Sequence, residues 1–211
     1  MTNLTLWGIG TPRTMRAHWM LMEFGVGYDY RPITSRSGET LTPEYLAINP
    51  KHKIPALQHG KLTITESFAI VSYIADAFDP PDGFFVPQDP ARRAALNEWC
   101  SFILMELDAL STYVIRKHAD LSDIYGDAPA AVESAKDYYS ELSGAVFDRL
   151  DPNQEFLMEE GMSVADILMT TCLVSAIRRG IAVPDYLLAY RDRMTERPAW
   201  KAAWPRNHPE T

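Results

Sequence analysis

Two short segments carry residues whose types and spacing suit the binding of a small charged ligand. The first runs Asn49-Pro50-Lys51-His52-Lys53-Ile54-Pro55-Ala56-Leu57, and the second begins at Thr65-Glu66-Ser67. Glu66 and Ser67 open a predicted helix, whose first turn offers unpaired N–H groups and partial positive charge to a carboxylate. Pro55 starts a strand without a backbone donor, at a bond where a cis peptide costs little. The two segments together predict a pocket for an extended, peptide-like, anionic ligand.

The elements around these segments form a predicted α/β half. Strands are expected over residues 4–7, 28–33, 55–58 and 62–64, and helices over 12–24, 43–48 and 66–78. Proline at position 12 favours a helix start there, and Gly25 and Gly27 end that helix. His59-Gly60-Lys61 is typical of a hairpin turn between the last two strands.

The strongest break in the chain is Asp79-Pro80-Pro81-Asp82-Gly83. Beyond it only helical patterns occur, and we expect helices over residues 91–119, 128–150, 163–179 and 184–194. An α/β half followed by an all-helical half implies two compact domains. We therefore expect an N-terminal domain over residues 1–79, a linker over 80–90 and an all-α domain over 91–211.

One helix start in the second half carries a folding signal. Ser163 with Asp166 three residues later matches a capping box, in which Asp replaces the usual Glu or Gln. Met162 and Ile167 stand at the positions of a hydrophobic staple. We interpret this motif as a structural device and assign it no chemistry.

Composition narrows the function classes. Of the 211 residues 46% are hydrophobic, so a core can form. The net charge is −8, so a basic surface for binding nucleic acid or an anionic membrane is not expected. No apolar run approaches the ~20 residues of a membrane span. Cys100 and Cys172 stand among apolar neighbours and are expected to be core thiols. A cytoplasmic location fits best, and no metal site is expected.

Four motifs, in order along the chain, resemble the cytosolic glutathione transferase family. They are Asn-Pro-x-x-Lys-Ile-Pro-Ala-Leu from Asn49, Glu-Ser-x-Ala-Ile-x-x-Tyr-Ile from Glu66, the capping box at Ser163, and Arg197-Pro198-Ala199-Trp200. The resemblance implies an N-terminal thioredoxin-like domain with the order βαβαββα, followed by an all-helical domain. It further implies a homodimeric detoxification enzyme that uses glutathione as co-substrate and needs no metal.

The resemblance also implies roles in glutathione binding. The backbone of Ile54, before a cis Pro55, would pair with the cysteinyl backbone of glutathione. Glu66 would meet the γ-glutamyl ammonium, and Ser67 with the helix N–H groups would meet its carboxylate.

A basic residue near the proline would complete the site by contacting the glycyl carboxylate. Lys53 resembles that contact, and His52 is the alternative. Structural interpretations of the same residues stay open: Glu66 as a favourable acid at a helix start, Ser67 as a first-turn hydroxyl, Pro55 as a trans strand-starter and Lys53 as a solvated loop charge.

The catalytic position must keep the glutathione sulfur as its thiolate, because the thiolate is the nucleophile. Burial alone raises a thiol pKa, so the site must supply hydrogen-bond donors and positive potential. The segment Gly10–Arg16 is similar to the Ser-Pro-x-Ser-x-x-Val pattern of serine-type members. Thr11 matches the first hydroxyl and Thr14 the second, although Thr11 also suits a helix cap. Arg13 and Arg16 either raise the local potential or lie at the surface.

The second, electrophilic substrate is expected between the domains, against the long helix that starts at residue 91. Met105, Asp108, Thr112 and Arg116 are three or four residues apart and would share one helix face. Most such stripes serve packing, so that alternative stays open. The chemistry expected is thiolate addition to a small, apolar electrophile, with isomerisation, dehalogenation or ether cleavage as variants. The alternative from another class is a non-enzymatic binding module with the same fold.

Overall fold

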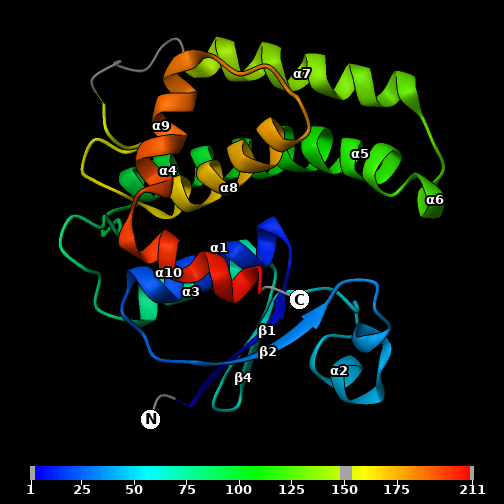
Figure 1. Ribbon diagram of the computed structural model, residues 1–211. Helices are drawn as coiled ribbons and strands as arrows, with labels where there is room; N and C mark the ends of the chain where they lie inside the picture. The colour runs from blue at the N-terminus through cyan, green and yellow to red at the C-terminus, as the bar shows by residue number, and fades with distance from the viewer. Residues whose placement is uncertain (1–2, 148–153, 210–211) are drawn as a thin grey trace. The chain divides into compact units, whose positions relative to one another are not determined.

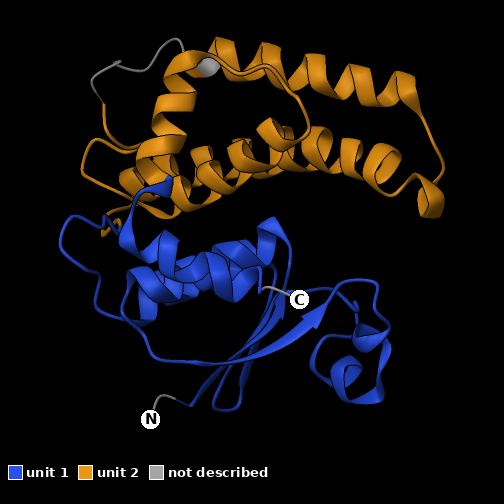
Figure 2. Cartoon of the chain, viewed as in Figure 1, with its two compact units in different colours: residues 1–86, 195–211 blue, residues 87–194 orange. Residues whose placement is uncertain are grey.

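The computed structural model describes residues 3–147 and 154–209, which form two compact units (Figure 2). Unit 1 comprises residues 1–86 and 195–211, and unit 2 comprises residues 87–194. Unit 2 is therefore shorter than the all-α domain expected over 91–211, because residues 195–211 group with the N-terminal part of the chain.

Unit 1 is built on a four-stranded sheet (Figure 1). Its strands are β1 (Leu4–Ile9), β2 (Asp29–Thr34), β3 (Ala56–His59) and β4 (Leu62–Thr65), in the order β2-β1-β3-β4. β1 is parallel to β2 and antiparallel to β3, and β3 and β4 form a hairpin. The helices are α1 (Pro12–Glu23), α2 (Pro43–Ile48), α3 (Ser67–Ala77) and α10 (Pro198–Asn207), with the short 3₁₀ turn η1 (Glu39–Leu41). The predicted thioredoxin-like βαβαββα arrangement is confirmed.

The helix α10 was not among the predicted helices. Pro205 lies inside it, and an internal proline argues against a helix because it lacks an N–H donor. The helix packs along α1, where the Trp19 and Trp200 rings meet edge to face with centroids 4.9 Å apart. At its start Arg197 forms an ion pair with Glu23, the last residue of α1. Packing against α1 therefore stabilises α10, a helix that its own sequence does not predict.

In the described part of unit 2 the regular elements are helical, apart from an isolated bridge between Met158 and Gly161 (Figure 1). Its elements are α4 (Pro90–Phe102), η2 (Ile103–Thr112), α5 (Tyr113–Ile115), η3 (Arg116–Asp120), α6 (Ser122–Tyr125), α7 (Pro129–Phe147), α8 (Val164–Arg178) and α9 (Asp185–Thr195). The helices predicted over 163–179 and 184–194 match α8 and α9, and that over 128–150 matches α7 up to Phe147. Residues 148–150 of that prediction lie outside the described residues.

The long helix predicted from residue 91 widens in its middle. The elements η2 and η3 are π-helical, and the Tyr113 N–H accordingly donates to the carbonyl of Asp108, five residues before it. A π turn holds more residues than an α turn, so it rotates the side chains that follow onto a different face.

The predicted capping box precedes α8. The Asp166 Oδ2 accepts from the Ser163 N–H at 2.8 Å and from its hydroxyl at 3.0 Å. Its Oδ1 accepts from the Leu157 N–H at 2.9 Å and the Tyr190 hydroxyl at 2.7 Å. Full burial raises the pKa of Asp166, and these hydrogen bonds oppose that rise. The motif is a structural device, as predicted.

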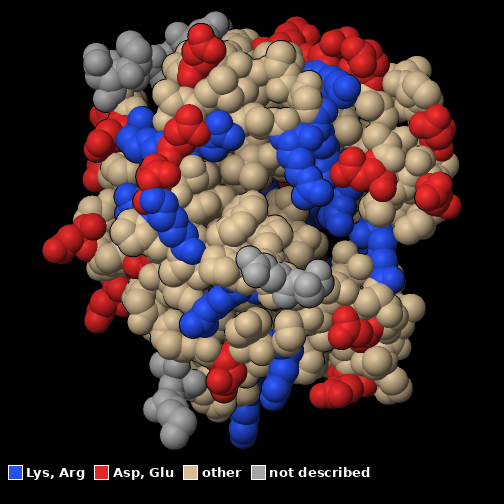
Figure 3. Space-filling view, in the orientation of Figure 1, with Lys and Arg blue, Asp and Glu red and all other residues tan. Residues whose placement is uncertain are grey.

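Charges of both signs are interspersed on the face shown in Figure 3. Within residues 3–147 and 154–209, no helix has the length and apolar character that crossing a membrane requires.

Candidate functional site

The register of the sheet gathers the predicted binding residues at one end of unit 1. Trp7 of β1 lies opposite Ala56 of β3, which lies opposite Thr65 of β4. Because both pairs are antiparallel, the residues just beyond this row, Gly8, Pro55 and Glu66, stand side by side at the same end of the sheet. Three segments that are separate in the sequence thus meet at one place.

Gly8 brings two of these segments into direct contact. Its φ is +111°, in the region that favours glycine, and the register of β1 against β2 shifts between Trp7 and Ile9. A Cβ at this position would lie 2.6 Å from the Ile54 Cβ and 3.0 Å from the Thr14 Cγ2. Glycine here lets Ile54 approach β1 closely. The Ile54–Pro55 peptide is cis, so the trans interpretation of Pro55 is wrong.

The loop before Pro55 is organised by two side chains that were not predicted as site residues. The carbonyl of Lys53 accepts from the Asn49 Nδ2 at 2.7 Å and from the Tyr45 hydroxyl at 2.5 Å. Asn49 and Tyr45 are buried, and burial raises the pKa of Tyr45 to about 12, so its hydroxyl stays a donor at neutral pH. The side chains of His52 and Lys53 are exposed, where a ligand carboxylate can reach them.

The start of α3 has the features of an anion site. Glu66 precedes it with φ +73°, an uncommon conformation for a residue other than glycine. Its side chain does not cap the helix but forms an exposed ion pair with Lys51. Ser67 is 6% exposed and is the first helical residue. Glu66 is thus an acid at the helix start whose own side chain leaves the first N–H groups of α3 uncapped.

A buried cation stands beneath this helix start. Arg16 of α1 is 1% exposed, and its Nη1 donates to the Ser67 Oγ at 3.2 Å. The surface interpretation is thus wrong for Arg16, while Arg13 is half-buried. Because the guanidinium occupies one lone pair of Ser67, the serine hydroxyl hydrogen can point to an anion.

Thr11 and Thr14 form the capping box of α1. The Thr14 N–H donates to the Thr11 Oγ1 at 3.0 Å, and the Thr11 N–H donates to the Thr14 Oγ1 at 3.0 Å. The two hydroxyl oxygens are 2.9 Å apart. Thr11 is 5% exposed and Thr14 is fully buried. Thr11 is therefore a helix cap, and of the two residues only Thr11 retains any exposure.

Asn207, the last residue of α10, contacts the same segment and was missed by sequence reasoning. Its Nδ2 donates to the carbonyl of Thr11 at 3.1 Å, and its Oδ1 accepts from the Thr14 hydroxyl at 2.6 Å. Its own carbonyl accepts from the Gly10 N–H at 2.8 Å. The only signal in the sequence is the helical spacing of Trp200, Ala203 and Asn207, all of which are buried.

The residues predicted for the second substrate lie in unit 2 and do not share one face. Met105 is 60% exposed, whereas Asp108 is 7% and Thr112 is 4% exposed. The π-helical turns explain the difference, since spacings of three and four residues return to one face only in an α-helix. Asp108 and Thr112 are together, with the Thr112 Oγ1 3.4 Å from the Asp108 Oδ1. Arg116 is half-buried in η3.

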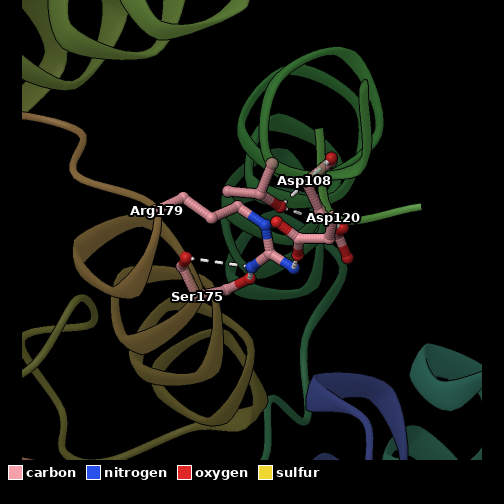
Figure 4. A network of polar contacts seen from close by, with 5 residues as sticks. Asp108, Asp120, Ser175 and Arg179 are labelled. Atoms are coloured by element: carbon pink, nitrogen blue, oxygen red, sulfur yellow. Dashed lines mark hydrogen bonds and ion pairs between the residues drawn. The ribbon is translucent and has the colours of Figure 1, made fainter. Parts of the chain in front are cut away.

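A polar network lies beside Asp108 (Figure 4). Arg179, at the end of α8, donates through Nη1 to the Ser175 carbonyl at 3.0 Å and to its Oγ at 2.5 Å. The Arg179 Nη2 lies 2.6 Å from the Asp120 Oδ2. This network joins the end of α8 to η3 and so supports the helical segment that carries the second-substrate candidates.

Metal-ligating side chains do not gather in the part of the chain that the structure describes, where no three of His, Cys, Asp and Glu form a cluster. Cys100 and Cys172 are buried thiols outside any disulfide, as expected.

Comparison with known proteins agrees with this geometry. Residues 2–76 match the family model of the glutathione S-transferase N-terminal domain. Glutathione S-transferase D7 of Drosophila melanogaster is 30% identical over 171 residues, which cover 80% of this chain and 73% of that protein. Glutathione S-transferase theta-3 of Mus musculus is 27% identical over 176 residues, or 81% of this chain and 72% of the other.

A solved structure extends the similarity to the whole fold. It is the theta class glutathione S-transferase of the citrus canker pathogen Xanthomonas axonopodis pv. citri with glutathione bound. It is 26% identical, covers 96% of this chain and 97% of its own, and superposes with a TM-score of 0.81.

Proposed function

Because this chain belongs to the glutathione S-transferase family, we propose that it activates glutathione through the hydroxyl of Thr11 at the N-terminus of α1. Membership in the family makes it a transferase with glutathione as co-substrate. The observation that carries the proposal is the Thr11–Thr14 pair at the start of α1: the two hydroxyl oxygens are 2.9 Å apart, Thr11 retains 5% exposure, and the Thr14 methyl group lies with Ile54 at Gly8.

Glutathione is proposed to bind along the end of the sheet where Gly8, Pro55 and Glu66 stand side by side. The backbone of Ile54 pairs with the cysteinyl residue, and the cis Pro55 gives that backbone its direction. Ser67, supported by Arg16 and by the first N–H groups of α3, holds the γ-glutamyl carboxylate. Glu66 meets the ammonium, for which it must exchange its exposed pair with Lys51. Lys53, or His52 in its place, meets the glycyl carboxylate.

The proposed chemistry is thiolate attack. The thiol proton is released to water, and the Thr11 hydroxyl donates to the resulting thiolate together with the positive end of α1. The sulfur electron pair then forms a bond to an electrophilic carbon, and the displaced group leaves with its own bonding pair. Thr11 resembles the serine of serine-type members, and its extra methyl group restricts the rotamers of the hydroxyl.

The electrophile and the assembly are further parts of the proposal. Met105, Asp108, Thr112 and Arg116 remain the residues proposed for the site of a small, apolar electrophile. Because they do not share one face, the exposed Met105 is the one proposed to contact it directly. A homodimer, a cytoplasmic location and the domain boundaries 1–79, 80–90 and 91–211 are further proposals. Glutathione-dependent isomerisation, dehalogenation or ether cleavage would use the same thiolate.

The test measures two properties of bound glutathione: its affinity, by calorimetry, and its thiolate absorbance in the ultraviolet as a function of pH. Thr11→Val should raise the thiol pKa by about one to two units because the donor is lost, whereas Thr11→Ser should retain the natural pKa. Thr14→Val is the matched control for the cap.

A pKa that rises only in Thr14→Val would transfer the role to Thr14. Glutathione bound without any thiolate absorbance in the natural protein would favour the non-enzymatic binding module.

A further inference from the structure

Asn207 determines in which direction the Thr14 hydroxyl points. The Thr11 carbonyl oxygen can only accept, so the amide group of Asn207 must face it with its NH₂. The Thr14 hydroxyl has two acceptors within reach, the Thr11 carbonyl at 2.8 Å and the Asn207 Oδ1 at 2.6 Å. The carbonyl already accepts from the Met15 N–H at 3.0 Å and from the Asn207 Nδ2, so the hydroxyl hydrogen is directed to the Asn207 Oδ1. Since a hydroxyl has one hydrogen, Thr14 has none left to donate to the hydroxyl oxygen of Thr11.

This assignment leaves Thr11 as the donor of the pair. The Thr14 Oγ1 already accepts from the Thr11 N–H at 3.0 Å, and the Thr11 Oγ1 accepts from the Thr14 N–H at the same distance. At 2.9 Å between the two oxygens, the remaining hydrogen belongs to Thr11. That hydrogen points to Thr14 in the free protein and can rotate to an incoming sulfur.

The same residue fixes the backbone on both sides of Thr11. Its carbonyl accepts from the Gly10 N–H at 2.8 Å, and its side chain donates to the Thr11 carbonyl. Asn207 is fully buried, so water does not compete for these bonds. Arg197 and Trp200, nearer the start of α10, attach the helix to α1 independently of Asn207.

We propose that Asn207 is a positioning residue for thiol activation: it fixes the backbone on both sides of Thr11 and accepts the hydrogen bond of the Thr14 hydroxyl, so that the Thr11 hydroxyl can donate to the glutathione sulfur. The inference rests on the proposed function, and it adds the C-terminal helix to the thiol-activating machinery. A role in stability alone would not affect the ionisation of a bound thiol, which gives the test its readout.

The experiment measures the thiol pKa of bound glutathione from the thiolate absorbance, and in parallel the affinity for S-methylglutathione, which has no thiol. Asn207→Ala should raise the thiol pKa by about one unit, a tenfold smaller thiolate fraction near neutral pH. Asn207→Asp should raise it further, because a carboxylate repels both the Thr11 carbonyl and the thiolate. S-methylglutathione should bind both variants as it binds the natural protein.

Two controls separate positioning from helix attachment. Lys201→Ala changes an exposed residue of α10, and Arg197→Ala weakens the attachment of the helix at its other end. Both should keep the natural thiol pKa. Asn207→Asp is nearly isosteric and serves as the second variant where Asn207→Ala does not fold.

The outcomes are distinct. A thiolate signal in the natural protein that keeps its pKa in a folded Asn207 variant overturns the inference and leaves Thr11 as the proposed donor. A thiol pKa that rises equally in Arg197→Ala overturns it too, because loosening of α10 would then be sufficient. Absence of a thiolate signal in the natural protein contradicts the proposed function itself, and the inference with it.

Discussion

The residues of the binding site differ in how directly their types reveal their roles. Ser67 is one of many first-turn hydroxyls, and its meaning depends on the buried guanidinium that donates to it. Arg16 is costly to bury unless its charge is compensated. A bound carboxylate would compensate it further through Ser67, so the pair is suited to the γ-glutamyl end of glutathione.

Arg16→Met is predicted to weaken binding of S-methylglutathione by about tenfold, because a hydrogen bond supported by a charge is lost while the aliphatic stem still packs. The thiol pKa of bound glutathione should rise far less than in Thr11→Val. Calorimetry and the thiolate titration measure the two effects. Arg13→Met is the matched control on the same turn, and an equal loss in it would contradict the prediction.

At the scale of elements, α1 links the sheet to the thiol-activating segment. His18, in the middle of α1, is fully buried, with its Nε2 3.2 Å from the Gly8 carbonyl and its Nδ1 2.8 Å from the Tyr28 hydroxyl. A neutral ring donates from Nε2 to the carbonyl and accepts at Nδ1 from Tyr28. The bond therefore holds α1 against the strand that carries Gly8.

The stability of the protein is predicted to fall as the pH drops from about 6.5 towards 4. Burial lowers the pKa of His18 from 6.5 to about 4, assisted by the charges of Arg206 and His208 and opposed by the Gly8 hydrogen bond. Within this window the unfolded chain binds the proton and the folded chain does not, so stability rises with pH and is complete above 6.5.

His18 contributes roughly 3 kcal/mol to the free energy of unfolding, because its pKa differs by about 2.5 units between the folded and unfolded states. Urea unfolding between pH 4 and 7 measures it. His18→Gln, which has no proton to gain, should show a shallower slope. Equal slopes in the two proteins would rule out His18 as the source.

At the scale of the whole molecule, unit 1 is assembled from both ends of the chain. Trp19 is fully buried, and its ring contacts Trp200 in α10. The Thr11 segment is held by Asn207. The N-terminal domain predicted over residues 1–79 contains all the glutathione-binding motifs, but it omits α10, the helix that packs along α1.

A fragment of residues 1–86 is therefore predicted not to fold stably and not to bind S-methylglutathione. Without α10, the surface of α1 is exposed, and each large apolar side chain that loses its cover lowers the free energy of unfolding by about 1.5–3 kcal/mol. That is a large share of the stability of a small unit. Circular dichroism and calorimetry on the fragment test this. The chain 1–86 joined by a flexible linker to residues 195–211 should regain structure, and folding of the shorter fragment alone would refute the prediction.

The sequence by itself determined the elements and the type of site. Alternating and helical patterns, glycines at helix ends and the Glu66-Ser67 pair are local properties, and local sterics and hydrogen bonds decide them. The βαβαββα order, the hairpin turn and the capping box of α8 were therefore predictable from short stretches of chain.

Only the tertiary structure decided which residues meet. The burial of Arg16 against Ser67, the π-helical turns that separate Met105 from Asp108, and the contact of Asn207 with Thr11 depend on packing between segments far apart in the chain. No local pattern encodes such a contact, because its energy arises after the elements have formed and buried their faces against each other. Thr11 could be proposed from the residues next to it in the sequence, but Asn207, which is proposed to position its hydroxyl, lies 196 positions away.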